Sequence, residues 1–411
     1  MKTTALALAA AAFAPNVLAW GAAADRAGHE IVATIAEIHL YPEVKEKLCH
    51  ILPPEAECHL APVAAWADTV RGRYPGTGPM HYVNPKEDNP GTHCTFGEHG
   101  WINEDVNVLT AIVNKTEALR GGGGGDINLR FLIHLMGDLH QPLHLTGRDR
   151  GGNNARFKFE GRVRSLHSVW DSGILLKNIR EFSNYTAPLP SKHIEEALPG
   201  AIFDSYVRWI VWEGIRQWWP NVQEEWLACP ADGDPYPHSL LEDIPRNEVD
   251  HGEWYRSAVD YAHGAVGYLP NALGDVIRLS IPAPVEVGEG MRDALLELHP
   301  KNEPKHIGPA CPYTWAREIH GTNCAHAWPL EYDPHGPLIE LDTDEYLGKI
   351  GRAKVLERLF AMGGLRLAKV LNEAVSDGKL KGVYVNYPKY EAENETAEAR
   401  PSAETRRTAE L

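Results

Sequence analysis

Apolar residues recur at helical spacing along most of the chain. Such runs predict helices, whereas alternating runs typical of strands are few. The predicted helices cover 28–50, 61–71, 102–120, 127–141, 195–227, 252–279 and 346–376. The pattern therefore predicts an all-α fold.

Segments without this periodicity mark connections and ends. Residues 228–251 and 281–345 are rich in Pro, Gly, Asp and His, which favours long surface loops. The glycine run 121–125 favours a connector, because it lacks the Lys-Ser/Thr pair and the preceding strand of a phosphate-binding loop. Residues 377–411 turn polar and aperiodic, so a disordered tail is expected there.

The N-terminal segment 1–19 is typical of a cleavable secretory signal. Lys2 precedes an Ala/Leu-rich run that ends in Val17-Leu18-Ala19. This run is shorter than the roughly 20 residues that a membrane-spanning helix needs. We therefore expect a secreted, extracellular protein that starts at Trp20 and does not bind membranes. Separately, we expect a monomer.

The number and spacing of the cysteines agree with secretion. The cysteines are even in number and none has a CxxC spacing, which favours disulfides over metal or redox sites. They are Cys49, Cys58, Cys94, Cys229, Cys311 and Cys324. N-glycosylation triplets start at Asn114, Asn184 and Asn394, which predicts a glycoprotein.

The net charge of -16 over 411 residues argues against nucleic-acid binding through a broad basic surface. Such binding depends on many contacts between Lys or Arg and phosphate. An anionic substrate must then be held locally, for example by bound metal.

Two His/Asp pairs have metal-ligand spacing. His134 and Asp138 lie four residues apart near the end of a predicted helix, so they share one face, and His167 and Asp171 repeat the pattern. One such pair is commonly a solvated contact worth ~0.3 kcal/mol. Two pairs in Trp- and Leu-rich surroundings predict a metal site, because isolated charges are costly to bury.

Further motifs complete an ordered set that resembles the S1/P1 nuclease family. The set comprises Trp20-Gly21, Gly28-His29, Trp66-Ala-Asp68-Thr-Val-Arg71, His81-Tyr82-Val83-Asn84, His134 to His144, Gly151-Gly152-Asn153 and His167 to Asp171. Residues 363–372 are similar to the closing helix of the family. The resemblance covers roughly 20–376, which we interpret as one large helical domain of the phospholipase C/P1 nuclease type with long, disulfide-stapled loops.

The resemblance implies three zinc ions, with Asp138 as a bridge between two of them. The implied ligands are Asp68, His81, His134 and Asp138 for one zinc, Trp20, His29 and Asp138 for the second, and His144, His167 and Asp171 for the third. Bound zinc lowers the pKa of water to about 7 and supplies the positive field that an acidic chain lacks.

The resemblance also implies roles in catalysis and substrate binding. Asp68, Arg71 and Asn153 are the implied catalytic residues, and Tyr82, Asn84 and Asn153 the implied substrate contacts. Arg71 either stabilises charge on the phosphate or only pairs with Asp68. Tyr82 is either a core aromatic or a platform for a base, where stacking is worth ~1–3 kcal/mol; stacking is favoured.

Two other features have competing interpretations. The tryptophan-rich segment 207–219 is interpreted as core rather than as a second base site. His140 points away from the ligand face, so we expect it to support the ligands from behind or to lie on the surface.

The chain departs from the family pattern in two places. Six residues separate Trp20-Gly21 from Gly28-His29 where the family usually has two, and we expect the extra residues to loop out if Trp20 is to reach the metal. Asn84 stands where well-known members have Asp, so the base preference stays open.

The implied reaction is hydrolysis of single-stranded DNA and RNA to 5'-phosphate products, with removal of 3'-phosphates from 3'-nucleotides. One alternative is a phospholipase C-like phosphodiesterase acting on lipid headgroups. Tyr82 and the lack of a membrane-seeking helix favour nucleic acid. A second alternative, a non-enzymatic zinc-scavenging protein, is disfavoured by the complete ligand set with Arg71 and Asn153.

The resemblance implies a Cys94–Cys324 bridge. Cys49 and Cys58 are close enough in sequence to clip a loop after the first helix. Cys229 and Cys311 then form the remaining pair.

Overall fold

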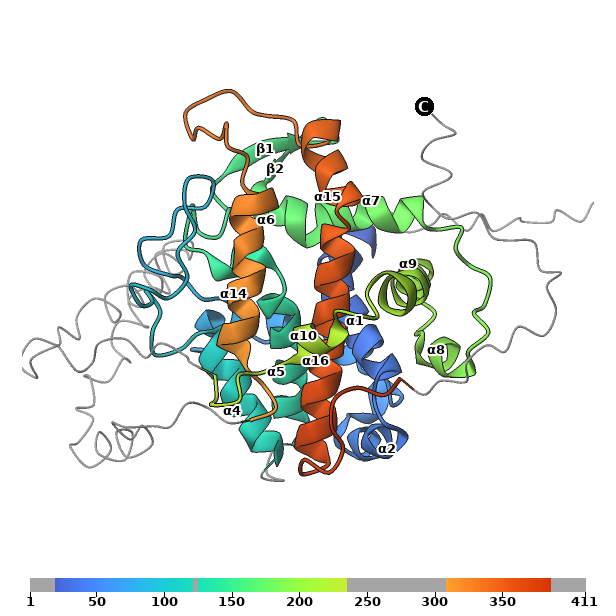
Figure 1. Cartoon of the computed structure of the whole chain (residues 1–411). Coiled ribbons are helices and arrows are strands. Elements are labelled where there is room, and N and C mark those ends of the chain that lie inside the picture. Colours follow the sequence, from blue (N-terminus) through green and yellow to red (C-terminus); the bar gives the residue numbers. More distant parts are fainter. Residues whose placement is uncertain (1–18, 121–124, 235–307, 386–411) are drawn as a thin grey trace, which may run out of the picture. The chain divides into compact units, whose positions relative to one another are not determined.

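The computed structural model describes residues 19–120, 125–234 and 308–385. These residues are mostly helical, and the one sheet among them has two strands (Figure 1). The predicted all-α fold is confirmed.

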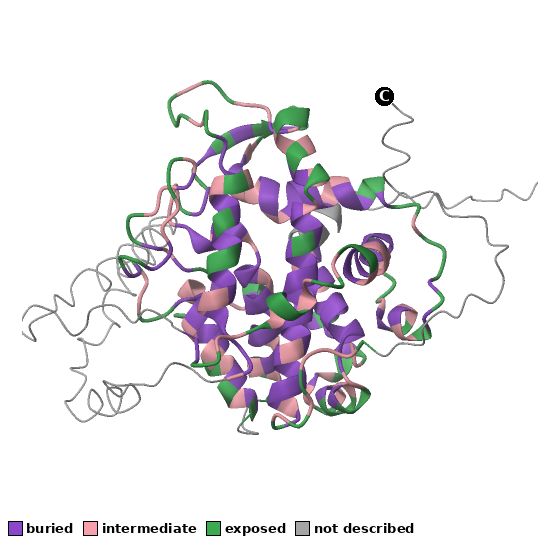
Figure 2. Ribbon diagram, in the orientation of Figure 1, coloured by how far each residue is buried: buried purple, intermediate pink, exposed green. Residues whose placement is uncertain are grey.

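Three long helices form the centre of this region: α1 (Ala19–Ile38), α5 (Gly125–Leu139) and α16 (Val355–Val375). Helix α1 packs along both α5 and α16, and most residues of α16 are buried (Figure 2). A Cβ atom at Gly364 would lie 2.3 Å from Cγ2 of Ile35, so this glycine allows α16 to approach α1 closely.

Shorter elements surround these helices. They are α2 (Pro42–Ile51), α3 (Trp66–Thr69), α4 (Val108–Arg120), α6 (Leu166–Ser168), α7 (Ile174–Glu181), α8 (Lys192–Ala197), α9 (Asp204–Trp209), α10 (Gln223–Leu227), α14 (Pro312–Thr322) and α15 (Lys349–Arg352). The 3₁₀ turns are η1 (Pro54–Ala56), η2 (Ala61–Val63), η3 (Gly78–His81) and η4 (Pro142–Leu145). The π-helical segments are η5 (Val169–Gly173), η6 (Ile210–Trp218), η7 (Asn323–Ala327) and η8 (Asp344–Gly348). Strands β1 (Arg156–Phe159) and β2 (Arg162–Ser165) pair antiparallel.

Helix α14 corrects the prediction that 281–345 is loop throughout. Pro312 begins the helix, where a missing backbone N–H costs nothing, and Trp315, Ala316 and Ile319 are buried at helical spacing. The Pro- and Gly-rich composition of the whole interval hid this short amphipathic stretch. The predicted helix at 252–279 lies outside the described residues.

The prediction of a disordered tail from residue 377 onward is wrong for residues 377–385. Residues 377–385 fold back, and the backbone N–H of Tyr384 donates to the carbonyl of His39 at 2.9 Å. The hydroxyl of Tyr41 donates to the carbonyl of Lys381 at 2.9 Å. The rest of the predicted tail, 386–411, lies outside the described residues, as do residues 1–18 of the predicted signal.

The three disulfides pair as predicted: Cys49–Cys58, Cys94–Cys324 and Cys229–Cys311. No helix among the described residues is long and apolar enough to cross a membrane. Asn114 and Asn184 are exposed, whereas the third glycosylation triplet lies outside the described residues. Glycosylation stays a prediction.

The tryptophan-rich segment is core at its start. Trp209 is buried and stacks on Phe182 with ring centroids 3.8 Å apart. Trp218 is 39% exposed at the end of η6. The core interpretation therefore holds for Trp209, and the segment reaches the surface at Trp218.

Candidate metal centre

Helices α1 and α5 bring His29 against His134. The two rings stack with centroids 3.9 Å apart, and Nδ1 of His29 is 3.1 Å from the carbonyl oxygen of His134. A Cβ atom at Gly137 would lie 2.4 Å from Nδ1 of His29. The missing side chain at Gly137 therefore makes room for the His29 ring.

A second set of ligand types forms where α3 and η3 meet α5. Oδ1 of Asp68 lies 3.7 Å from Nδ1 of His81 and 3.6 Å from Nε2 of His134. Nδ1 of His134 is 2.8 Å from the carbonyl oxygen of Ala64, which directs Nε2 toward this set.

A third set comes from η4, α6 and η5. Nε2 of His167 lies 3.1 Å from Oδ2 of Asp171, and Nε2 of His144 lies 3.8 Å from Oδ1 of Asp171. Nδ1 of His167 is 2.7 Å from the carbonyl oxygen of Gly151. Gly151 has φ +61°, and a Cβ there would lie 2.6 Å from the carbonyl oxygen of Leu143. The glycine thus shapes the turn that orients His167.

Asp138 lies between these sets. Its carboxylate is 3.0 Å from His81, 3.2 Å from His134 and 3.0 Å from His144, and 3.7 Å from His29. Burial alone would raise the pKa of Asp138, but the surrounding imidazoles outweigh burial and hold its pKa well below the usual range. Asp138 is therefore an anion held among imidazoles from different elements.

The donor chemistry fits bound metal. In each of three trios the donor atoms lie within 4.8 Å of one another: His29, His134 and Asp138; Asp68, His81 and His134; His144, His167 and Asp171. In addition, Nδ1 of His81 faces these donor atoms, 3.0 Å from Oδ2 of Asp138 and 3.0 Å from Nε2 of His134. Imidazole nitrogens and carboxylate oxygens grouped in this way are ligand types that zinc takes in proteins.

Protonation differs between the histidines. Burial, followed by the neighbouring His134, lowers the pKa of His29 to about 4, so its imidazole is neutral at neutral pH. Burial would also lower the pKa of His144, but Asp138 and Asp171 raise it to about 9. His144 must therefore lose a proton before it can bind a cation.

Arg71 lies at the exposed edge of the centre. Its Nη2 is 2.6 Å from Oδ1 of Asp68, and the two side chains are 53% and 40% exposed. The Arg71 guanidinium thus forms an ion pair with Asp68, as the alternative interpretation of Arg71 expected.

Two of the implied substrate contacts, Tyr82 and Asn84, follow His81 closely in sequence. Tyr82 follows His81 and is 37% exposed, so it is not a core aromatic. The backbone N–H of Asn84 donates to Oδ1 of Asn103 at 2.9 Å. Asn153 is exposed, and its Nδ2 donates to the carbonyl of Arg150 at 2.9 Å.

Trp20 is not brought to the centre. Helix α1 runs without a break from Ala19 to Ile38, so the expected loop before His29 is wrong. Alanine is the strongest helix former, and Ala22, Ala23 and Ala24 continue the helix backwards. At 1.5 Å per residue, the backbone of Trp20 lies roughly 14 Å from that of His29 along the axis. The Trp20 side chain lies outside the description.

His140 is neither on the surface nor among the ligands. It is buried, with Nδ1 2.7 Å from the carbonyl oxygen of Met136 and Nε2 3.1 Å from Nη1 of Arg366. Burial, followed by the charge of Arg366, lowers its pKa to about 3. The neutral ring therefore links the end of α5 to α16.

Sequence reasoning missed two supporting residues. Gly137 is the first, and a glycine inside a helix, which costs about 1 kcal/mol relative to alanine, is a usable signal of close packing. The second is Gln141, whose Nε2 donates to Oδ1 of Asp171 at 2.5 Å. Gln141 belongs to the His134–His144 motif, but its partner comes from another segment.

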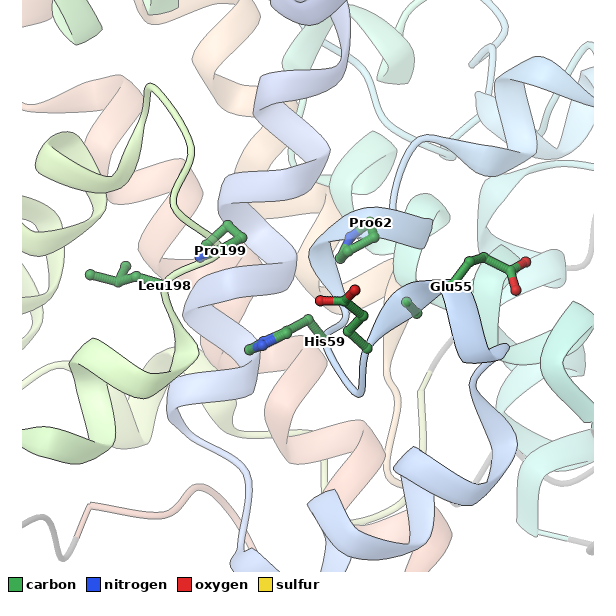
Figure 3. Close-up of a pocket in the computed structure, with 7 residues that line it drawn as sticks. Glu55, His59, Pro62, Leu198 and Pro199 are labelled. Carbon is green, nitrogen blue, oxygen red and sulfur yellow. The ribbon is translucent and has the colours of Figure 1, made fainter.

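A separate surface pocket contains none of the predicted site residues (Figure 3). It is lined by Glu55, Ala56, Glu57, His59, Pro62, Leu198 and Pro199. Nδ1 of His59 is already 2.8 Å from Glu37, so the lining offers acidic and apolar groups but no histidine cluster. The chemistry of the molecule is therefore sought at the His/Asp trios.

Comparison with known proteins identifies the family of the chain. Residues 21–234 match the family described as S1/P1 Nuclease, and the chain belongs to that family. It is 34% identical to Endonuclease 2 of Arabidopsis thaliana over 39% of this chain and 58% of that protein. It is 30% identical to Endonuclease 4 of Arabidopsis thaliana over 54% of this chain and 73% of that protein. It is 31% identical to Nuclease S1 of Aspergillus oryzae (strain ATCC 42149 / RIB 40) over 40% of this chain and 57% of that protein. The chain thus spans less than two thirds of two of these relatives.

Proposed function

We propose that the protein is a zinc-dependent nuclease that hydrolyses phosphodiester bonds of single-stranded DNA and RNA to 5'-phosphate products and removes 3'-phosphates from nucleotides. The observation that carries the proposal is the position of Asp138, a buried carboxylate within 3.0–3.7 Å of imidazoles from α1, η3, α5 and η4. Family membership supports the same reaction.

We assign three zinc ions. Asp68, His81, His134 and Asp138 would hold one, His29 and Asp138 a second, and His144, His167 and Asp171 a third. Trp20 could become a ligand of the second zinc only if the first turns of α1 unwind after the signal segment is removed. When bound, zinc supplies a Lewis acid for phosphate oxygens and lowers the pKa of water to about 7.

The chain's own side chains bind and orient the substrate. Arg71 can leave Asp68 once that carboxylate is ligated, and its guanidinium then stabilises the negative charge that develops on the phosphate. Asn153 can donate an amide N–H to a phosphate oxygen. Tyr82 offers an exposed ring for one splayed base, so duplex should be a poor substrate.

The lipid-headgroup alternative is not favoured, because the relatives named above are nucleases. We propose a secreted monomer with the domain over 20–376, to which the packed residues 377–385 are added. The paired cysteines suit an oxidising compartment.

The test is product analysis after digestion of a mixed single-stranded oligonucleotide by the mature protein with zinc. The proposal predicts 5'-phosphate products, a slow rate on duplex, and loss of metal and activity in His134→Ala. Products ending in 3'-phosphate, or equal rates on duplex and single strands, would contradict it.

A further inference from the structure

The β1–β2 hairpin is a local basic surface on an acidic protein. Between 148 and 164 the chain has six Arg or Lys residues against two acidic residues, whereas the whole chain carries a net charge of -16. Three exposed cations, Arg150, Arg156 and Lys158, are here called the hairpin cations.

The hairpin cations are exposed. Phe157 and Phe159 alternate with Arg156 and Lys158 and are buried, so these two cations lie on the solvent side of β1. Arg162 pairs with Phe159 and therefore lies on the other side. Among the described residues, no ion pair to a hairpin cation is found within 4.0 Å. Their charges are therefore available to a ligand.

Nearby acidic groups are already engaged. Glu160 pairs with Arg180 at 2.5 Å. Glu340 forms a bridge with Lys158 of β1, and its carboxylate accepts the backbone N–H groups of Gly161 at 3.0 Å and Asp342 at 2.9 Å. In the part of the chain that the structure describes, neither Glu160 nor Glu340 forms an ion pair with a hairpin cation within 4.0 Å.

The hairpin is continuous with the metal centre. Strand β2 leads directly into α6, which carries His167. At the base of the hairpin the N–H of Leu166 donates to the carbonyl of Ala155 at 2.9 Å, and the N–H of His167 donates to that of Gly152 at 3.3 Å. In the strand register Arg156 faces Ser165, two residues before His167.

We propose that the hairpin cations bind phosphates of the single strand beside the scissile bond; this inference rests on the proposed function. Arg156 and Lys158 are two residues apart on one face of β1, so at about 3.3 Å per residue their backbones lie about 7 Å apart along the strand that leads away from the centre. That length suits one or two backbone phosphates, which carry no base information. The hairpin thus favours a polynucleotide over a mononucleotide.

The test compares salt dependence of binding. The probe is a fluorescent, nuclease-resistant phosphorothioate single strand of about 12 nucleotides, and the protein is the zinc-loaded full mature chain. Arg156→Gln/Lys158→Gln removes two charges from exposed positions. Each lost phosphate contact should flatten the slope of log K, the association constant for the probe, against the logarithm of the salt concentration by about 0.7.

The matched control is Lys192→Gln/Lys379→Gln, which removes two exposed charges elsewhere. Lys192 begins α8, where His193 contacts the carbonyl of Ile38 at the C-terminal end of α1, nine residues after His29. Lys379 follows α16 in the segment that packs near His39. This pair should keep the wild-type slope, and Arg156→Lys should keep it too, because the phosphate contact needs only the charge.

In the hairpin variant alone, the slope of log K against log salt should be flatter by about 1.4. Over a fourfold change in salt concentration, the affinity of this variant relative to wild type should therefore change about sevenfold. The KM for a long single strand should rise more than the KM for a 3'-mononucleotide. A wild-type slope in the hairpin variant, or a larger loss of binding to anionic lipid vesicles than to the single strand, would overturn the inference. Wild-type protein that binds the probe but cleaves no single strand would instead reject the proposed function.

Discussion

Replacing Gly137 by alanine should damage the metal centre while leaving the fold intact. The new Cβ would lie 2.4 Å from Nδ1 of His29, and ordinary contacts begin near 3.4 Å, so the ring must move by about 1 Å. The Cβ belongs to the backbone of α5 and cannot turn away. A misplacement of about 1 Å in a catalytic group can cost about 10²-fold in rate.

The free energy of unfolding of Gly137→Ala should stay close to the wild-type value or increase. Alanine is better than glycine in a helix interior by about 1 kcal/mol, which offsets strain around the displaced ring. The control is Gly321→Ala in α14, where no atom lies within 4 Å of the new Cβ. Zinc per chain, the rate of single-strand cleavage and the thermal unfolding midpoint should be measured for both.

For Gly137→Ala we expect less than the full zinc content and a rate reduced about 10²-fold, with an unfolding midpoint close to wild type. Gly321→Ala should match wild type in zinc and rate. Wild-type zinc content and rate in Gly137→Ala would refute the reasoning that this glycine positions His29.

Three further predictions follow from the centre and the disulfides. Asp138→Asn should lose metal from more than one site and nearly all activity, as elemental analysis and a cleavage assay would show, because its carboxylate contacts imidazoles of each trio; retained zinc would contradict this. Arg71→Ala should lower kcat by about 10²–10³ if the guanidinium stabilises developing charge, whereas an unchanged kcat would leave only the pair with Asp68. Cys94→Ser should reduce the free energy of unfolding by about 2–5 kcal/mol in denaturant titration, and an unchanged value would show that the bridge is dispensable.

The sequence predicted the elements that combine length with clear periodicity. Helix α16 falls within a predicted interval and α5 starts two residues before one, because apolar residues recur over many turns. Strands β1 and β2 have four residues each, too few for alternation to stand out. Helix α14 was missed because only 11 residues carry the pattern within a Pro- and Gly-rich interval.

For the site, spacing could predict which residues share a helix face but not which distant elements meet them. Nε2 of His134 and Oδ2 of Asp138 lie 3.2 Å apart, and the i,i+4 spacing places both residues on one face of the helix. The partner of His140, Arg366, lies 226 residues away, so no local pattern distinguishes a buried link from a surface group. The family spacing favoured a loop before His29, but local alanine propensity favours the helix that is observed.

The most direct test of the central claim is the zinc content of folded, active, mature protein, measured by elemental analysis on the sample used for cleavage. We predict three zinc ions per chain, with single-strand cleavage that disappears on chelation and returns with zinc. One zinc or none in fully active protein would contradict the proposed centre.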